Sequence, residues 1–215
     1  MLKILFYAYR EWAIELVNSI DHPFKCLIQR NDYTAIKDIK PDIIFFIGWS
    51  EIVPKEIIEK NICICLHPSL LPKYRGGSPI QHQIMNGEEF GGVTLFRMNE
   101  VLDGGDILYQ MPIGLEGELN DIFNSIKFVG KEGIGEIIKY GIAGIEEAAH
   151  PQRLEYGTIL KRRKPEESEI TLNEIVNSTA LQLHNKIRAL ADPYPNAYIK
   201  CKNGEKLYIT KSRIG

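Results

Sequence analysis

Short apolar runs alternate with polar or helix-like segments along the first part of the chain. The runs are rich in isoleucine and phenylalanine, and they span Ile4–Tyr7, Phe24–Ile28, Asp42–Ile47 and Ile62–Leu66. Runs of this length and composition are typical of β-strands. Strands that alternate with helices predict βαβ units and a parallel sheet.

Apolar positions at helical spacing lie between these runs. In Glu11–Ser19, the residues Trp12 and Leu16 share one side of a helix that follows the first strand directly. This segment is therefore expected to be a crossover helix. A second, short amphipathic helix is expected over Lys55–Lys60, started by Pro54.

The middle of the chain predicts two more helices and two more strands. A serine N-cap and a first-turn proline start a helix over 79–86. Two β-like runs follow, at Val93–Met98 and Ile107–Ile113. Isoleucines on one face predict a long helix over Asp121–Ile142.

The character of the chain changes near Tyr156. A charged connector, Lys161–Pro165, precedes a helical segment, Asn173–Leu190, and a hairpin, Ala197–Thr210, that turns at an Asn-Gly pair. We therefore expect an α/β fold with a Rossmann-like, open, mainly parallel sheet and helices on both faces, over residues 1–155. A C-terminal extension of connector, helix and hairpin is expected over 156–215.

Composition narrows the functional classes. The chain has 215 residues, of which 44% are hydrophobic and 25% charged, with a formal net charge of −2. This balance is usual for soluble globular proteins, and it argues against binding to nucleic acid through phosphate neutralisation. The N-terminus lacks a signal-peptide pattern, and no apolar stretch approaches the length of a membrane span. We expect a cytoplasmic protein without a membrane or nucleic-acid partner.

Cysteine usage points to reduced thiols rather than disulfides. The four cysteines lie mostly in apolar runs. Cys63, Cys65 and His67 fall on one side of a strand and are residue types that bind zinc. Because no second ligand pair with metal spacing lies nearby in the sequence, we expect no metal site.

The stretch from Cys65 to Gly76 contains the first candidate for chemistry. Alternation along the strand sends the side chains of Cys65 and His67 to the same face, at the carboxyl end where open α/β sheets bind ligands. Pro68 and Pro72 bracket the following loop and stiffen it beside the histidine. Taken alone, His67 also fits a packed or capping residue.

The second candidate is Asp103, which precedes two glycines. Gly104 and Gly105 allow a sharp turn and a close approach of a flat ligand to the backbone. A carboxylate set against His67 would stabilise the charged imidazole, and such a couple suits general acid–base catalysis. Taken alone, Asp-Gly-Gly also fits a plain turn.

These residues belong to a longer pattern. The sequence from Cys65 to Gln110 resembles the folate-dependent formyltransferase family, whose motif contains Asn-x-His-x-Ser-Leu-Leu-Pro, Arg-Gly, Gly-Val-Thr and Asp-x-Gly-x-Ile. In this chain the matching positions are His67, Ser69–Pro72, Arg75-Gly76, Gly92–Thr94 and Asp103–Ile107. The tail resembles the sugar-nucleotide and tRNA branches of the family at Arg163–Glu166 and Ile187–Pro195.

The resemblance implies roles for these residues. An acceptor amine would attack the formyl carbon of 10-formyltetrahydrofolate, His67 would stabilise the developing oxyanion and shuttle the amine proton, and Asp103 would orient His67. Cys65 stands where the family has asparagine, and a thiol is a poorer hydrogen-bond donor than a carboxamide. Three alternatives stay open: an active enzyme with another donor, a variant with weakened turnover, and a non-catalytic folate or nucleotide-sugar binding relative.

The resemblance also implies where the ligands bind. The folate would lie between one segment before the strand of His67 and one loop after it. Its implied contacts are Gly48, Trp49, Ser50, Ile52, Met98, Leu102, Asp103 and Asp106. The expected acceptor contacts, which include cations for a diphosphate, are Arg10, Ser69, Lys73, Tyr74, Arg75 and Gly77.

The branch of the family fixes the expected acceptor. Tyr7–Trp12 occupies the place of the purine-pathway enzyme's Gly-x-Gly-Ser-Asn phosphate loop, and the chain ends before a C-terminal barrel like that of the tRNA branch. The expected acceptor is therefore a nucleotide-linked amino sugar carrying UDP, dTDP or GDP, and a homodimer is the assembly to test. The alternative acceptor is a carrier-bound aminoacyl group or another small amine.

Overall fold

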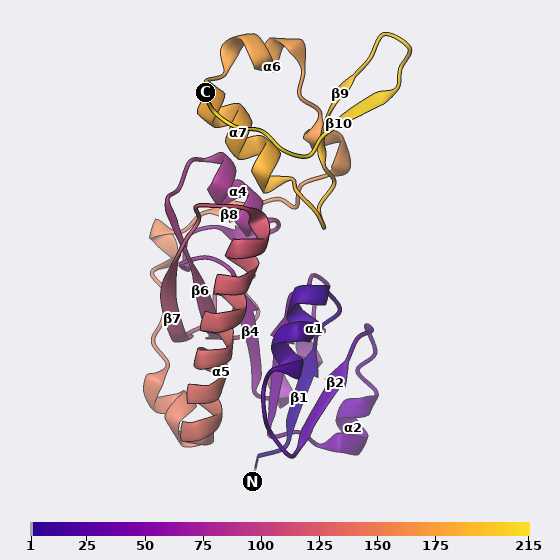
Figure 1. Cartoon of the computed structure of the whole chain (residues 1–215). Helices are drawn as coiled ribbons and strands as arrows, with labels where there is room; N and C mark the ends of the chain where they lie inside the picture. Colours follow the sequence, from indigo (N-terminus) through magenta and orange to yellow (C-terminus); the bar gives the residue numbers. More distant parts are fainter. Residues whose placement is uncertain (1) are drawn as a thin grey trace.

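A six-stranded mixed sheet forms the centre of the molecule, with strand order β2-β1-β3-β4-β6-β7. The computed structural model describes residues 2–215 (Figure 1). The strands are β1 (Ile4–Tyr7), β2 (Lys25–Ile28), β3 (Ile43–Ile47), β4 (Cys63–His67), β6 (Phe90–Arg97) and β7 (Ile107–Gly114). The first four strands are parallel, and β6 and β7 are antiparallel to their neighbours. The expected open, mainly parallel sheet is confirmed.

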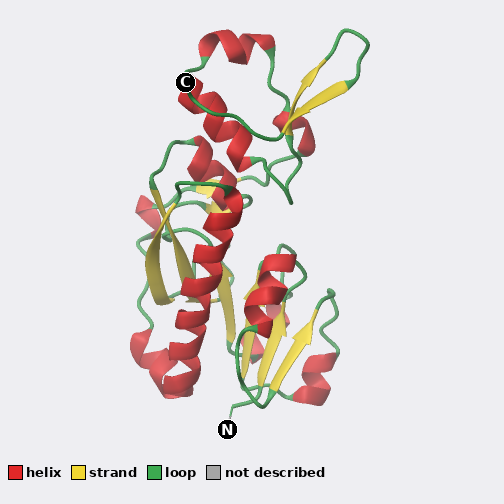
Figure 2. Ribbon diagram, viewed as in Figure 1, coloured by secondary structure: helices red, strands yellow, loops and turns green. Residues whose placement is uncertain are grey.

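Helices cover both faces of the sheet, as Figure 2 shows. On one face, Phe6 and Phe45 stack with ring centroids 5.2 Å apart under α1 (Glu11–Asn18) and α5 (Leu119–Ala148). On the other face, Tyr7 and Phe46 stack at 5.1 Å. The helices there are α2 (Ala35–Ile39) and α3 (Lys55–Lys60), of which α2 was not expected from the sequence. Alternate residues of one strand thus fill two different cores.

Helix α5 lies directly on the sheet because small residues face it. A Cβ added to Gly133 would lie 2.5 Å from Tyr109 and 2.7 Å from Leu95. The helix extends beyond the predicted end at Ile142, with a break at Gly141, whose φ of 67° is favoured only by glycine. Its N-terminus forms a capping box between Glu118 and Asp121.

The C-terminal residues form a smaller unit at one end of the sheet (Figure 1). It contains α6 (Leu172–Asn177), α7 (Ala180–Ala189) and a hairpin of β9 (Ala197–Lys200) and β10 (Lys206–Ile209). The hairpin agrees with the sequence. The single predicted helix is two helices, because Ser178 is extended (φ −111°, ψ 150°) and the Thr179 side chain caps α7 by accepting from the backbone of Gln182.

Two of the contacts that attach this unit to the sheet domain come from α7. Helix α7 packs beside α4 (Pro79–Met85), which is the helix expected over 79–86. The Arg188 guanidinium donates to the backbone oxygen of Leu115 at 2.6 Å. Burial lowers the pKa of this guanidinium from its usual value.

A third connection crosses the loop that follows β4. Residues 158–162, here called the strap, include β8 (Ile159–Leu160), which pairs in parallel with β5 (Arg75–Gly76). The strap also accepts a hydrogen bond from the Gly77 amide at 2.9 Å, through the oxygen of Leu160. The sequence predicted only a charged connector here. Two-residue strands have no periodicity that a sequence pattern can reveal.

No helix among residues 2–215 is long and apolar enough to cross a membrane. Within the same residues, no cluster of three or more histidine, cysteine or acidic side chains could hold a metal ion.

Candidate functional site

His67 and Asp103 lie together at the carboxyl ends of the parallel strands. His67 is the last residue of β4 and is buried, and its Nδ1 lies 3.4 Å from Oδ2 of Asp103. Its Nε2 lies 2.8 Å from the backbone oxygen of Tyr74. Because a carbonyl oxygen can only accept, Nε2 carries a proton and Nδ1 is the nitrogen that faces the carboxylate. The expected pairing of these two side chains is therefore present.

The backbone around Asp103 holds its carboxylate in place. Asp103 has a left-handed φ of 47°, which is uncommon for a residue with a side chain. The amide of Gly76 donates to Oδ2 at 2.8 Å. A Cβ on Gly105 would overlap the backbone oxygen of Arg97, so only glycine fits at that position. The turn is thus fixed at the point where it presents a carboxylate to His67.

Cys65 lies beside this pair, as strand alternation predicts. Its Sγ is 3.7 Å from the backbone oxygen of Leu66, and its side chain packs against a small cluster that includes Leu71 and Phe96. Burial, and to a smaller extent the charge of Asp103, raise the pKa of the Cys65 thiol well above its usual value. The residue at the family's asparagine position is therefore a protonated, poorly donating thiol.

Buried polar side chains stiffen the loop between His67 and Arg75. Ser69 is fully buried, and its hydroxyl donates to the oxygen of Lys73 at 2.7 Å. Thr94 donates to the oxygen of Ser69 at 2.7 Å, and Gln110 donates to the oxygen of Leu71 at 3.0 Å. Ser69 therefore stabilises the loop, and its side chain has no exposed surface for contact with an acceptor.

The residues implied for the folate lie at two loops that flank the pair. Gly48 follows β3 with a φ of 58°, and an added Cβ would lie 2.9 Å from Ala13. Trp49 contacts Tyr7 edge-on, and its buried indole N–H has no acceptor among residues 2–215. Ser50 accepts a 3.4 Å hydrogen bond from Arg10.

Apolar side chains on these loops are open to solvent. Ile52 is 90% exposed and Leu102 is 56% exposed. Met98 is partly buried against the cluster around Phe96, and its amide donates to Cys63 at 2.8 Å. Asp106 is exposed and accepts from the Arg97 amide through its backbone oxygen at 2.8 Å. Exposed apolar residues on both loops suit a flat heteroaromatic ligand.

The cations expected near an acceptor differ in exposure. Lys73 is exposed, and Arg10 is half-buried with its guanidinium 5.5 Å from the centroid of the Tyr9 ring. Arg75 is buried, and its Nε has no partner among the described residues. The Tyr74 hydroxyl donates to Glu88 at 2.7 Å.

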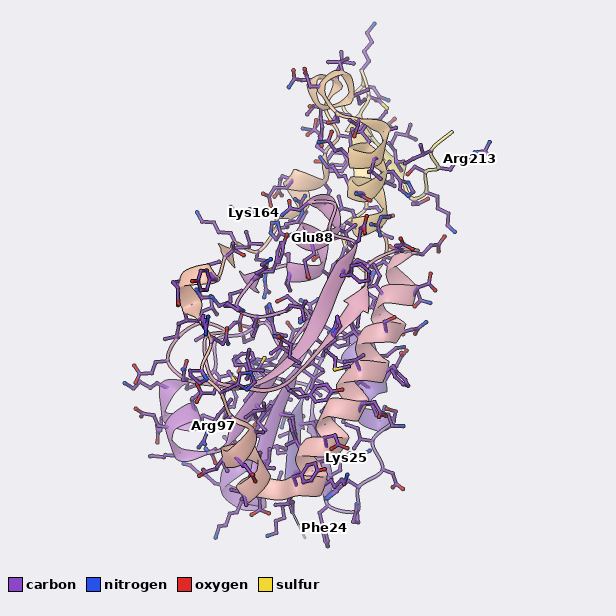
Figure 3. The ribbon with its side chains drawn as sticks, turned by 90° about the vertical axis from the view of Figure 1, so that its left-hand side faces the viewer. Phe24, Lys25, Glu88, Arg97, Lys164 and Arg213 are labelled. Carbon is purple, nitrogen blue, oxygen red and sulfur yellow. The ribbon has the colours of Figure 1, made fainter. Side chains whose placement is uncertain are left out.

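Gly77 lies where the strap passes closest to the loop. An added Cβ would overlap the backbone of Arg162. Figure 3 shows Glu88 and Lys164 at the end of the sheet where the strap leads into the C-terminal unit, far from Lys25 and Phe24 at the opposite end.

Two side chains at the site were not predicted from the sequence. Gln152 donates to the backbone oxygens of Asp103 and Gly105, and Arg162 of the strap donates to the backbone oxygen of Ser50 at 3.3 Å. Neither stands in a recognisable motif. Proximity in the fold, which no local pattern reveals, is the only signal that identifies them.

A separate cavity of about 770 Å³ lies between the start of α5, helix α7 and residues 210–214. None of the site residues above lines it.

An α/β sheet that holds a His–Asp pair at the carboxyl ends of its parallel strands defines a catalytic domain suited to proton transfer on a bound ligand. The chain belongs to the formyl transferase family: the model of that family's main domain matches residues 25–138, and the model of its C-terminal domain matches residues 162–215.

Individual relatives agree with this family assignment. The methionyl-tRNA formyltransferase of Clostridioides difficile is 34% identical over 203 residues, which cover 88% of this chain and 60% of the relative. The chain thus spans about 60% of the length of the curated relatives it matches. Among solved structures, a methionyl-tRNA formyltransferase from Clostridium thermocellum has a TM-score of 0.80 at 27% identity, with 97% of both chains covered.

Two further structures share the fold at lower identity. A sugar N-formyltransferase from a Shewanella species has a TM-score of 0.75 at 19% identity, covering 99% of this chain and 98% of that one. HypX from Aquifex aeolicus, in complex with tetrahydrofolic acid, has a TM-score of 0.78 at 22% identity. It covers 95% of this chain and 36% of HypX. Similar chains are thus described with different acceptors.

Proposed function

We propose that this protein is an N-formyltransferase that moves a formyl group from 10-formyltetrahydrofolate to the amine of a nucleotide-linked amino sugar. The observation that carries the proposal is the buried His67–Asp103 pair, 3.4 Å apart, within the longest stretch of family motif in the chain. The flanking loops fit the folate, because Ile52 and Leu102 expose apolar surface.

The bound formyl donor supplies an activated carbonyl carbon. The acceptor nitrogen forms a bond to that carbon, the bond from the carbon to the donor nitrogen breaks, and the amine proton passes to the donor nitrogen. In this chain the proton is held at Nδ1 of His67, because Nε2 already donates to Tyr74. Asp103 stabilises the charged imidazole while it holds the proton. Atoms and charge balance without a further reactant.

Cys65 leaves the developing oxyanion with one strong donor fewer than the family motif provides. Its protonated thiol is a weak donor. The charged imidazole of His67 therefore bears most of the stabilisation from side chains. We expect turnover to be real but modest.

The acceptor assignment is supported by unpaired positive charge on the segments around the His67–Asp103 pair. Arg10, Lys73 and Arg162 have no carboxylate within ion-pair distance among residues 2–215. Arginines without a protein carboxylate are suited to phosphate oxygens, which they bind with paired hydrogen bonds. A sugar linked to a nucleoside diphosphate carries both the amine and such phosphates.

Methionyl-tRNA is the second candidate acceptor. It is favoured by the 34% identity to the Clostridioides difficile enzyme, and the strap cations could equally meet the phosphates of an acceptor stem. The formal net charge of −2 favours the smaller ligand, because tRNA binding draws on extended basic surface.

One experiment distinguishes the two acceptors. The full chain is incubated with 10-formyltetrahydrofolate and one acceptor in each of several parallel reactions. The acceptors are UDP-, dTDP- and GDP-linked amino sugars and methionyl-tRNA. Mass spectrometry then detects the gain of one formyl group, and absorbance follows the release of tetrahydrofolate. We expect formylation of at least one nucleotide sugar. Comparable or faster formylation of methionyl-tRNA would overturn the acceptor, and no tetrahydrofolate release with any amine would overturn the activity.

A further inference from the structure

The Gln152 side chain contacts the backbone of the turn that carries Asp103. Its Nε2 donates to the backbone oxygen of Asp103 at 3.0 Å and to that of Gly105 at 2.7 Å. These two carbonyls flank Gly104, so one carboxamide bridges the turn that follows the catalytic carboxylate. We propose that Gln152 is a positioning residue, which fixes the angle at which Asp103 meets His67.

The orientation of the Gln152 amide is determined by its partners. Both contacts are carbonyl oxygens, which only accept, so the NH₂ group must face them. Its Oε1 is buried and has no partner among the described residues. A buried acceptor without a partner is costly and rare in native proteins. The structure tolerates this cost while the NH₂ group makes both contacts to the turn.

The segment that carries Gln152 is itself fixed to the sheet. Two residues earlier, His150 exchanges backbone hydrogen bonds with Ile107, the first residue of β7, at 2.9 and 3.1 Å. The segment that carries the Gln152 carboxamide is therefore bonded to β7, the strand that follows the Asp103 turn. Contacts thus connect β7 through Gln152 to the Asp103 backbone. The Asp103 carboxylate in turn contacts His67.

The turn needs such a contact because its backbone is strained. Asp103 has a φ of 47°, a conformation that persists only when the surroundings impose it. Other restraints on the turn include the bond from the Gly104 amide to the Val101 oxygen and the bond from the Gly76 amide to the Asp103 side chain. Of these contacts, only that of Gln152 holds the backbone carbonyls of Asp103 and Gly105. Without it, the carboxylate keeps the hydrogen bond from the Gly76 amide, but the backbone that carries it can shift relative to Nδ1.

This inference rests on the proposed function for its kinetic part and needs two variants. Gln152→Met keeps the length of the side chain and removes both donors. Gln152→Glu sets carboxylate oxygens against two carbonyl oxygens, which repel them. We expect kcat to fall about ten- to a hundredfold in Gln152→Met, as for a displacement of about 1 Å, and further in Gln152→Glu. The fall in kcat should exceed the rise in either KM.

A second readout does not need turnover. In ¹⁵N-labelled protein, the Nδ1 and Nε2 resonances of His67 report separately on Asp103 and on Tyr74. In Gln152→Met we expect the Nδ1 resonance to move toward its position in Asp103→Ala, while the Nε2 resonance stays. If the parent protein formylates no acceptor, this measurement still tests the positioning role.

The matched control is Asn196→Leu in the C-terminal unit. Asn196 also donates from one NH₂ group to two acceptors, Asp192 and Tyr194, but it lies outside the site. The Asn196→Leu substitution should lower thermal stability and leave kcat and both His67 resonances unchanged. A folded Gln152→Met protein with parental Nδ1 resonance and kcat within twofold of the parent would overturn the proposal. If Gln152→Met does not fold, the same resonance comparison in Gln152→Glu decides.

Discussion

At the scale of single residues, two contacts on one imidazole define the proposed catalytic pair. Nε2 of His67 is engaged by Tyr74, and Nδ1 faces Asp103. We predict that His67→Asn and Asp103→Ala each lower kcat by a factor of about a hundred to ten thousand, the usual range for a general acid–base group. Steady-state formylation kinetics give the measurement. The control is His184→Asn, which removes a histidine bonded to Ser212 away from the site.

Folding should survive these changes, because neither side chain belongs to the apolar cores. A melting temperature within a few degrees of the parent would separate lost chemistry from lost structure. Activity within tenfold of the parent for either variant would contradict the assigned roles.

The buried thiols give a prediction about reactivity and pH. Burial raises the pKa of Cys63 to about 12 and raises that of Cys65 well above its usual value. A higher pKa leaves less thiolate at any given pH, and only the thiolate is alkylated. At about pH 8, we predict that iodoacetamide labels exposed Cys201 first. It should label Cys63 on the order of a thousandfold more slowly, and Cys65 more slowly than Cys201.

Peptide mapping by mass spectrometry over time checks this order. Labelling of Cys63 should keep accelerating as the pH rises above 9, and unfolding in denaturant should make all four cysteines react alike. Equal labelling of Cys65 and Cys201 in the folded protein would show that the Cys65 side chain is open to solvent.

The position of Cys65 tests the oxyanion argument. Cys65→Asn adds a strong donor beside His67, and we predict that kcat rises by roughly tenfold or more, since one oxyanion donor is worth that much or more. Cys65→Ala is the matched control and should resemble the parent, because the thiol donates little. A clear drop in kcat for Cys65→Asn, with both ligands still binding, would show that the apolar surroundings of Leu71 and Phe96 have adapted to sulfur.

At the scale of elements, the strap depends on a residue without a side chain. A Cβ on Gly77 would overlap the backbone of Arg162, which can yield only if the strap shifts. We predict that Gly77→Ala loosens residues 158–162, speeds tryptic cleavage in the basic run 161–164 and lowers kcat. Gly135→Ala is the control, because its Cβ meets nothing within 4 Å and alanine favours a helix by up to about 1 kcal/mol. Unchanged cleavage in Gly77→Ala would mean that the strap accommodates the methyl group.

The sequence predicted the large elements and missed the small ones for a physical reason. Strands β1, β3 and β4 are buried runs whose composition identifies them, and α3 was predicted with its observed bounds, Lys55–Lys60. Strands β5 and β8 have only two residues each and are held by partners 84 positions apart, Arg75 and Ile159. Long-range pairing of this kind leaves no local periodicity.

The candidate site likewise contains residues that the sequence predicted and residues that it did not. The approach of Asp103 to His67 was predicted from the family motif in which both residues stand. Strand alternation alone placed only Cys65 and His67 on the same face. Gln152 and Arg162 could not be predicted, because each acts on backbone oxygens that any sequence would supply. Ser69 stood in the motif, yet it is enclosed by the loop that the motif builds.

At the scale of the whole molecule, unpaired charge should make the proposed acceptor site sensitive to salt. Arg10 and Arg162 both reach Ser50, one from the N-terminal part of the chain and one from the strap. We predict that the KM for a nucleotide-linked amino sugar rises severalfold between about 0.05 and 0.5 M salt, as screening weakens its phosphate contacts. The same sugar without its nucleotide should show no such rise. Equal salt dependence for both acceptors would remove the phosphates from the argument.

The strap also sets an order of events during synthesis on the ribosome. All four parallel strands, His67 and Asp103 precede Gln152 and the strap in the chain. A nascent chain that has emerged only as far as α5 can form its sheet, yet β5 still lacks β8 as a partner and the Asp103 turn still lacks Gln152. Because domains generally fold from the N-terminus as they are made, the sheet precedes the working site. In a growing chain the contacts around His67 and Asp103 are therefore completed only after Leu160 has emerged from the ribosome.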